Sequence, residues 1–587
     1  MDKQSIILVI ALGLLVIFWI PIMTGLGLIE PPKEPPQTTE QPAQQVEQQP
    51  VEQQSVERQP VETEKTIAAA KPSGQTSTES SRETGLTLDE TASEIPIDTV
   101  FIETNVWSIL LTNEGGGPVS FKLKKYLDQE GQPIQMLPDC QASTPEFSFQ
   151  NGSLVDSRFM FVSSKPSGTY TVNNQTFELT YSFQSKSGGT ITKRYRFYPD
   201  RYDYDLVIEM SGLNELGIER EYAIEWNNKL NPTELNIKDD YSSFWAMALM
   251  GTERVKFNDY DDGKFAVSHS GATNWIATRS KFFTSILVPR SQPGSGANAS
   301  GVESAIVTPN GTIESKALAI GIEMDIPNQS TVTDSFSVFV GPMDYEILKK
   351  FNNDVIDIID IGTTPFVGWI IKLFAIPIMW LMPRMYKIIP NYGFVIIIFS
   401  LLIKMITLPL SKKTVRSMMA MRELQPKMEE LKKKHKKNPQ ALNKEMMKLY
   451  KEHGVNPLSG CLPYLPQMPL FFALFAVFRS TILLRQAHFI LWWNDLSRGA
   501  MSFTDPYIIL VIIMAGLMFV QQKMTMTDPK NKMLIYLMPL MMGFFFYKAA
   551  AGLVLYWTCF SLFSWIEQLV FKRPTVATTG EVEVVKE

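Results

Sequence analysis

Residues 392–410 read YGFVIIIFSLLIKMITLPL, an apolar run interrupted by a single charged residue, Lys404. An α-helix rises about 1.5 Å per residue, so a run of this length reaches about 28 Å, close to the roughly 30 Å thickness of the hydrocarbon core of a bilayer. The stretch therefore predicts a transmembrane helix with a lysine inside it, and it places the chain among membrane proteins.

Other apolar runs predict further spans. The chain begins with one, residues 5–23, preceded by Lys3. A cleaved signal peptide would start in the same way, but nothing after Pro21 resembles a small-residue cleavage site, so we expect an uncleaved anchor. If residues 547–551 form a turn, the predicted total is six spans. The remaining runs are 462–478, 507–520, 533–546 and 552–571.

Residues 366–385 are also apolar, but Lys372, Pro377, Pro383 and Arg384 interrupt them. A segment of this kind either crosses the bilayer or lies along its surface. We expect an amphipathic helix in the outer interface, within a linker of residues 346–390.

Charge changes sign along the chain and predicts its orientation. Residues 30–360 carry 27 Lys and Arg against 47 Asp and Glu, whereas residues 361–587 carry 27 against 12. The loop 411–455 holds 13 Lys and Arg against 5 Glu, and basic loops stay in the cytoplasm. Alternation of the spans then places the acidic region outside and both termini in the cytoplasm.

The acidic region divides into a tether and a folded domain. Residues 30–96 are mostly Pro, Gln, Glu, Ser and Thr, which cannot bury enough apolar surface to offset their ordering entropy, so we expect a disordered tether behind an anchor of residues 1–29. From 97 to 345 apolar and polar residues alternate, for example in residues 177–183, FELTYSF. Repeated short strands with turn residues between them predict an antiparallel β-sandwich.

Lys404 is the most costly residue in the predicted spans. A lysine inside a membrane helix costs roughly 2.5–3.5 kcal/mol on insertion scales, and such residues usually face a polar cavity. Its side chain could instead extend to the headgroups, because Leu410 ends the apolar run about 9 Å further on. The other spans contain no acidic residue except Glu567 near a helix end. We therefore expect an unpaired cation in a hydrated groove.

Polar side chains in the spans are candidates to line that groove. Ser400 lies one helical turn from Lys404 on the same face of the helix. Each of the others could equally form a hydrogen bond between helices. They are Gln467, Gln521, Gln522, Thr558 and Ser561.

The basic loop 411–455 has the pattern of a helical hairpin, because apolar residues recur every three or four positions on both sides of Asn438-Pro439. An antiparallel coiled coil is expected, with a basic tip at residues 432–437 that includes Lys433 and Lys434. The tip is either a solvated face or a docking surface for ribosomal RNA or anionic lipid. The apolar residues are Met421, Leu424, Met428 and Leu431 before the break and Leu442, Met446 and Leu449 after it.

Several kinds of active site lack the necessary residues. The three cysteines (Cys140, Cys461 and Cys559) and four histidines are scattered without disulfide or metal-ligand spacing, and no Walker-type glycine loop is present. We therefore expect no cofactor and no enzymatic activity.

Motifs in both halves of the chain closely resemble those of the YidC-type membrane protein insertases (the YidC/Oxa/Alb family), in the Gram-negative form with a large periplasmic domain. The likeness covers nearly the whole chain except the tether and the tail, residues 572–587. The motifs are NPLSGCLP at 456–463, QMP at 467–469, GLVLYW at 552–557, NEGGG at 113–117, WIA at 275–277 and GPMDY at 341–345.

The resemblance implies a multi-pass protein of the bacterial inner membrane with five core helices, within residues 391–571, around a groove open to cytoplasm and lipid. In this family a basic groove residue attracts the acidic polar tail of a substrate. By position, Lys404 matches that residue, Ser400 a nearby hydroxyl, and Tyr556-Trp557 the aromatic part of the last helix. Lysine keeps the charge of the family's arginine but loses its bidentate geometry.

The implied activity is insertion and folding of newly made inner-membrane proteins, alone or with the Sec translocon. Implied partners are nascent membrane proteins, SecYEG and SecDF, the lipid bilayer, and the ribosome and targeting factors at the hairpin, but not DNA. Two other interpretations stay open: a transporter or channel, although no internal duplication is visible, and a membrane-tethered periplasmic protein that binds or processes carbohydrate, although His269 is the one histidine in that domain.

Overall fold

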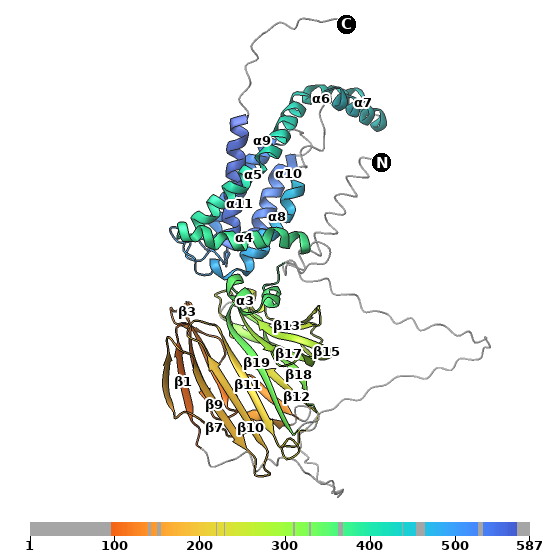
Figure 1. Cartoon of the computed structure of the whole chain (residues 1–587). Coiled ribbons are helices and arrows are strands. Elements are labelled where there is room, and N and C mark those ends of the chain that lie inside the picture. The colour runs from red at the N-terminus through yellow and green to blue at the C-terminus, as the bar shows by residue number, and fades with distance from the viewer. Residues whose placement is uncertain are drawn as a thin grey trace, which may run out of the picture.

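The computed structural model describes residues 96–571 except 139–141, 150–153, 219, 228, 309–310, 328–329, 362–367, 437, 454–463 and 526–531. The predicted anchor, nearly all of the tether, the NPLSGCLP motif and the tail lie outside these residues. The described parts form a β-domain and a helical bundle stacked end to end, with a helical hairpin at the far end of the bundle (Figure 1).

The β-domain contains two sheets, as the alternating sequence predicted. The smaller sheet has the strand order β4-β3-β2-β1-β8. The larger has the order β6-β5-β12-β18-β17-β15-β16-β19-β11-β10-β9-β7, with β13 beside β15 and β14 beside β13. The described pairings are antiparallel except for the parallel pair β1 and β8.

The strands of the smaller sheet are β1 (Thr99–Thr104), β2 (Trp107–Thr112), β3 (Gly117–Leu127), β4 (Pro133–Gln135) and β8 (Gly168–Val172). Those of the larger sheet are β5 (Glu146–Phe149), β6 (Leu154–Val155), β7 (Val162–Ser163), β9 (Phe177–Gln184), β10 (Thr190–Phe197), β11 (Asp203–Ser211), β12 (Glu221–Trp226), β13 (Trp245–Met250), β14 (Glu253–Phe257), β15 (Lys264–Arg279), β16 (Phe283–Pro289), β17 (Gly294–Thr308), β18 (Gly311–Asp325) and β19 (Thr331–Pro342).

The NEGGG motif holds a buried charge at the centre of this domain. Lys193 of β10 is fully buried, forms an ion pair with buried Asp156, and donates a hydrogen bond of 2.6 Å to the carbonyl oxygen of Gly115. The hydroxyl of Tyr195 donates to the next carbonyl, Gly116, at 2.8 Å. Gly115 has a φ of 74°, and a Cβ there would overlap Ser143. The motif therefore folds as a turn that only glycine fits and whose carbonyl oxygens accept from β10.

The bundle is built from helices that follow the apolar runs. Helix α11 packs against α5, α8 and α9, α10 packs against α9, and α4 packs against α8. The long helices are α4 (Gly368–Ile388), α5 (Tyr392–Glu423), α6 (Gln425–Lys434), α7 (Pro439–Glu452), α8 (Tyr464–Ser480), α9 (Ile508–Thr525), α10 (Lys532–Phe546) and α11 (Ala551–Phe571). The short ones are α2 (Ile237–Tyr241) and α3 (Tyr345–Phe351), with 3-10 helices at Asp156–Arg158, Asn353–Ile359 and Ile482–Leu484.

Three of the described helices are long and apolar enough to cross a bilayer: Gly368–Ile388, Tyr392–Pro409 and Ala551–Val570. Helices α8, α9 and α10 have shorter apolar segments. The predicted count of six spans is therefore not settled by length and composition alone. Helix α4 differs from the others in direction, because it lies across the end of the bundle that adjoins the β-domain (Figure 1).

The hairpin differs from its prediction in one respect. Helix α5 does not end with the apolar run but continues to Glu423, so Met421 belongs to α5, and the first arm of the hairpin is the short helix α6. The predicted break is present: the side chain of Asn438 accepts a hydrogen bond from the backbone N–H of Ala441 at 3.1 Å, and Pro439 starts α7. Between α6 and α7, Leu424 and Met428 are buried against Met446, Leu449 and Tyr450.

Candidate functional site

The Lys404 side chain lies between α5 and α11 and is sealed from solvent. Its Nζ is 2.6 Å from Oε2 of Glu567 and donates a hydrogen bond of 2.8 Å to Oγ of Ser564. The side chains of Lys404 and Glu567 are 9% and 6% exposed, so the charges face each other rather than water. The ring of Phe560 lies 5.0 Å from the same Nζ, which adds a cation–π contact.

One face of α11 supplies these contacts. Phe560, Ser564 and Glu567 follow a four- and three-residue spacing, which places them on the same side of a helix. The hydroxyl of Ser564 also donates to the carbonyl oxygen of Phe560 at 2.8 Å, which orients its lone pairs toward Lys404. The local sequence of α11 thus builds an acceptor site for one cation.

The prediction of an unpaired cation at Lys404 is wrong. Glu567 is near the end of its apolar run, four residues before the last residue of α11, yet its carboxylate contacts Lys404 on α5. A carboxylate close to the end of one helix is therefore the partner of a lysine inside the apolar part of the other. The Lys404 side chain thus turns toward α11 instead of extending along α5.

The other predicted groove residues are spread over several helices. Ser400 is fully buried, and its hydroxyl donates to the carbonyl oxygen of Ile397 at 2.7 Å. Thr558 is buried and bonds its own helix at Val554, 2.7 Å away. Each hydroxyl proton thus has an acceptor on its own helix. Of the remainder, Ser561 is buried on α11, whereas Gln467 on α8 and Gln521 on α9 are half-buried.

The aromatic pair on α11 packs within the bundle. Tyr556 is 1% exposed, and its ring lies 6.3 Å from that of Phe399 on α5. The ring of Trp557 meets Phe471 of α8 edge-on at 5.1 Å and lies 6.1 Å from Phe546 of α10. The two neighbours therefore join α11 to three different helices.

The outward face of α5 is apolar, whereas its charged and hydroxyl side chains at positions 404 and 400 are turned inward. On α5, Met405 and Ile406 are 59% and 72% exposed, whereas Ser400 and Lys404 point inward and are buried. A water-soluble helix would show the opposite pattern, because exposed apolar surface of this size is costly in water. The pattern is that of a helix surrounded by lipid, with its costly charges turned toward a partner helix.

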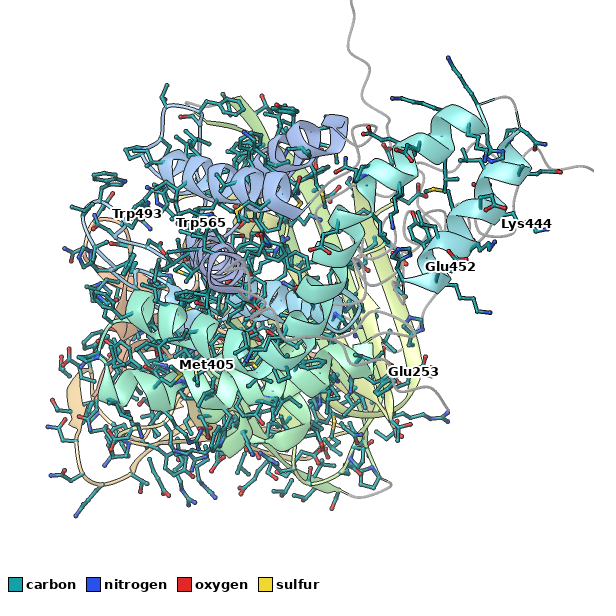
Figure 2. The ribbon with its side chains drawn as sticks, turned by 90° about the horizontal axis from the view of Figure 1, so that it is seen from above. Glu253, Met405, Lys444, Glu452, Trp493 and Trp565 are labelled. Atoms are coloured by element: carbon teal, nitrogen blue, oxygen red, sulfur yellow. The ribbon has the colours of Figure 1, made fainter. Side chains whose placement is uncertain are left out.

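The hairpin presents charge instead. In the view from above, Lys444 and Glu452 project from a hairpin that extends to one side of the bundle, away from Met405 and Trp565 (Figure 2). Lys433 and Lys434 are exposed, and Leu431 and Leu442 are half-buried. A cleft of about 290 Å³ lies between α6 and α7. Its lining residues are Lys427, Glu430, Leu431, Lys434, Glu445, Lys448, Leu449 and Glu452.

Two family models match successive parts of the chain. Residues 99–381 match the YidC periplasmic domain, and residues 384–578 match the family described as 60Kd inner membrane protein. The membrane protein insertase YidC of Prosthecochloris aestuarii is 33% identical over 600 residues, covering 98% of this chain and 96% of the relative. The chain belongs to the YidC family of membrane protein insertases.

The chain is also similar to other YidC proteins. The membrane protein insertase YidC of Chlorobium phaeovibrioides is 34% identical over 497 residues, which cover 81% of this chain and 83% of the relative. Among solved structures, an active YidC insertase with its first transmembrane domain resolved has a TM-score of 0.35 and 19% identity, and the match covers 83% of this chain and 96% of that one.

The family assignment settles the function at the level of the whole protein. The chain is a membrane protein insertase with a periplasmic β-domain, and its substrates are nascent membrane proteins. The transporter and carbohydrate-binding alternatives are not favoured. Sequence reasoning missed Ser564 and Phe560 and gave Glu567 no role. Their shared spacing on α11, with the one acidic residue of the predicted spans at its end, was the signal that could have found them.

Proposed function

We propose that this insertase receives the hydrophilic tail of its substrate at Lys404, on the face shared by α5 and α11. A lysine buried among apolar helices, with Ser564 and Glu567 as its partners, supports this role because such a residue is costly to keep in a membrane. The groove residues Ser400, Gln467, Gln521, Thr558 and Ser561, with Tyr556 and Trp557, would extend the polar path on either side.

The proposed site shortens the distance over which a polar tail must cross hydrocarbon without water. A polar tail loses its hydration when it crosses hydrocarbon, and an isolated charge is the costliest part to move. A lysine within the bundle offers a substrate carboxylate an opposite charge part of the way across. Apolar segments of the substrate meanwhile move into lipid past the exposed apolar face of α5, and their transfer from water supplies the driving force.

The test is insertion by purified full-length protein in liposomes, with a substrate whose translocated tail carries either Asp or Asn. Lys404→Met should slow insertion of the Asp substrate about tenfold, while Lys404→Arg keeps most of the rate because its charge is retained. Lys523→Met on α9 removes the same charge elsewhere and serves as the control. Equal insertion by all four proteins would refute a role for the Lys404 charge.

We also propose that α4 lies in the outer interface of the bilayer rather than across it. Its inner face, with Ile371, Ala375 and Ile378, is buried toward α8, whereas Trp369 and Trp380 are 69% and 49% exposed. Exposed tryptophans are typical of the headgroup region. Quenching of Trp380 fluorescence by lipids brominated at different depths should be strongest for shallow positions. A maximum at the bilayer centre would contradict this placement.

The hairpin is proposed to face the cytoplasm, with both termini on the same side, and to dock the ribosome and targeting factors. The excess of lysine on its surface supports this side, since basic loops are retained there. Association with the Sec translocon, SecYEG and SecDF, is a further proposal that rests on the family. Labelling of single cysteines at positions 2, 436 and 585 by an impermeant reagent should require disrupted cells.

A further inference from the structure

The Lys404 site already contains a carboxylate from the chain itself. Glu567 Oε2 stands 2.6 Å from Lys404 Nζ, in the position that an aspartate or glutamate of a bound substrate would take. Ser564 accepts a second hydrogen bond from the same ammonium group at 2.8 Å. The substrate carboxylate and Glu567 therefore compete for one cation.

The carboxylate of Glu567 is only partly satisfied by its contacts. Its second oxygen, Oε1, is buried and has no hydrogen-bond partner among the described residues. A carboxylate has acceptor capacity on both oxygens, so burial with one oxygen unsatisfied is unfavourable. In a buried ion pair the cost of removing water is comparable to the attraction between the charges. Exchange of Glu567 for a better-satisfied carboxylate is therefore nearly balanced in free energy.

Glu567 also lies near the end of its helix. It stands four residues before the last residue of α11, Phe571, or about 6 Å along the helix axis. A glutamate side chain can span most of that distance by changing rotamer. Its place between Lys404 and the end of α11 also means that a tail entering from that end meets Glu567 first.

We propose that Glu567 is a resident counter-ion that occupies the Lys404 site in the absence of substrate and is displaced by an acidic residue of the substrate tail. This inference rests on the proposed role of Lys404. It makes Glu567 a specificity-determining residue. The ion pair stays intact in the presence of neutral tails and breaks only when another carboxylate replaces that of Glu567. The cost of displacement also weakens the binding of acidic tails, which allows the substrate to leave.

The experiment measures binding separately from insertion. Full-length protein in liposomes receives a purified single-span substrate with a benzophenone next to an Asp, Asn or Lys in its tail, and crosslinking yield is measured against substrate concentration. Glu567→Gln should lower the half-saturating concentration of the Asp substrate by roughly tenfold, within the range usual for linked binding equilibria, and leave the Asn substrate unchanged. Glu452→Gln in the hairpin removes the same charge far from Lys404 and should change neither.

Removal of Glu567 alone could destabilise the bundle, and a lower thermal midpoint in detergent would reveal this. A charge-swapped variant then provides the test. Lys404→Glu combined with Glu567→Lys keeps a neutral pair, and it should prefer the Lys substrate to the Asp substrate. Crosslinking of the Asp substrate that is unchanged by Glu567→Gln, together with no reversal in the swapped variant, would overturn the resident counter-ion. If Lys404→Met also binds all three substrates as the parent does, the proposed role of Lys404 fails instead.

Discussion

Arg485, which follows α8, is joined to Glu234 of the β-domain across 251 positions of sequence, with Nε donating to Oε1 at 2.6 Å. The two side chains are 2% and 7% exposed. Arg485 also donates to the carbonyl oxygen of Leu127 at 2.9 Å and lies over the ring of Phe283. A neighbouring pair, Arg479 with Asp239 at 3.5 Å, joins the same two parts. The β-domain is thus held on the bundle by a buried polar junction rather than by a loose linker.

Loss of one partner from this junction should be more harmful than loss of both. Arg485→Leu leaves Glu234 buried without its counter-charge, which typically costs about 3–5 kcal/mol. Hydrogen–deuterium exchange of residues 233–241 and 481–487 should rise in this variant, and the thermal midpoint should fall. The double variant Arg485→Leu with Glu234→Leu should recover much of the loss.

Arg196→Leu provides the matched control, because Arg196 and Glu178 form an ion pair of 2.8 Å with both side chains 51% exposed. Exposed pairs contribute about 0–1 kcal/mol, so this variant should resemble the parent. If Arg485→Leu is equally mild, the junction does not hold the two parts together.

The junction should also respond to pH through Asp240. Burial, and then repulsion from Glu234, raise the pKa of Asp240 from 3.8 to about 6. The folded state therefore binds this proton more tightly than the unfolded chain. The charged form of Asp240 therefore lowers the free energy of unfolding above about pH 6. Protonation relieves this as the pH falls toward 4, a change of up to roughly 3 kcal/mol. Thermal unfolding of the parent and of Asp240→Asn between pH 4 and 7.5 checks this sign.

The effect of Asp240 is measured as the difference in thermal stability between the parent and Asp240→Asn at each pH. Asp240 accepts from the N–H groups of Thr233, Glu234 and Lys281, and asparagine can accept on only one oxygen, so Asp240→Asn carries a fixed penalty at every pH. Relative to this variant, the parent should gain stability as the pH falls. Burial acts to raise the pKa of Asp239, but attraction to Lys281 and Arg479 outweighs it, and Asp239→Asn should show the opposite trend. The same trend in both variants would contradict the assignment.

The local patterns of the sequence were enough to predict that the domain is built of β-strands and where the hairpin breaks. Alternation of apolar residues in 177–183 corresponds to β9, where Leu179 lies opposite Tyr195 and Phe183 opposite Ile191. Asn438-Pro439 combines a capping side chain with a residue that cannot donate within a helix, so its position was readable directly. Each of these features depends on residues close together in the chain.

Features that depend on distant residues were not predictable in this way. Hydropathy marks where a helix would leave the bilayer, not where it ends, so the continuation of α5 to Glu423 was missed. The pairing of Lys404 with Glu567 depends on how α5 packs against α11, and the parallel pairing of β1 with β8 likewise depends on tertiary packing. No spacing within one segment encodes these contacts.

Two glycines in the bundle should respond in opposite ways to alanine. A Cβ at Gly393 would lie 1.9 Å from Cδ2 of Phe489 and within 2.6 Å of two more ring atoms, so Gly393→Ala must displace the buried Phe489 ring from the start of α5. A Cβ at Gly516, within α9, meets nothing within 4 Å. Gly516→Ala should therefore raise the thermal midpoint, since alanine is favoured over glycine in helices by up to about 1 kcal/mol, whereas Gly393→Ala should lower it. A rise in both would mean that Phe489 adjusts without cost.

Two variants of the hairpin separate the effect of its fold from the effect of its charge. Met428→Ala removes a buried side chain from the small contact between α6 and α7, where Leu424 is the other fully buried residue. This should cost about 2–5 kcal/mol, enough to unfold a two-helix unit of this size. Lys433→Glu with Lys434→Glu instead changes two exposed side chains at the end of α6 and should leave most of the helix in place, apart from a small loss at its C-terminus.

If the hairpin docks the ribosome through its basic tip, sedimentation of ribosomes with liposomes that contain the full-length protein should fall for both variants. The charge-reversed variant should lose the salt-dependent part of binding, because that part comes from contacts between lysines and phosphates. Met428→Ala should lose binding together with protection of residues 425–452 from hydrogen exchange. Binding that survives charge reversal but is lost with Met428→Ala would show that the folded hairpin, and not the charge of Lys433 and Lys434, makes the contact.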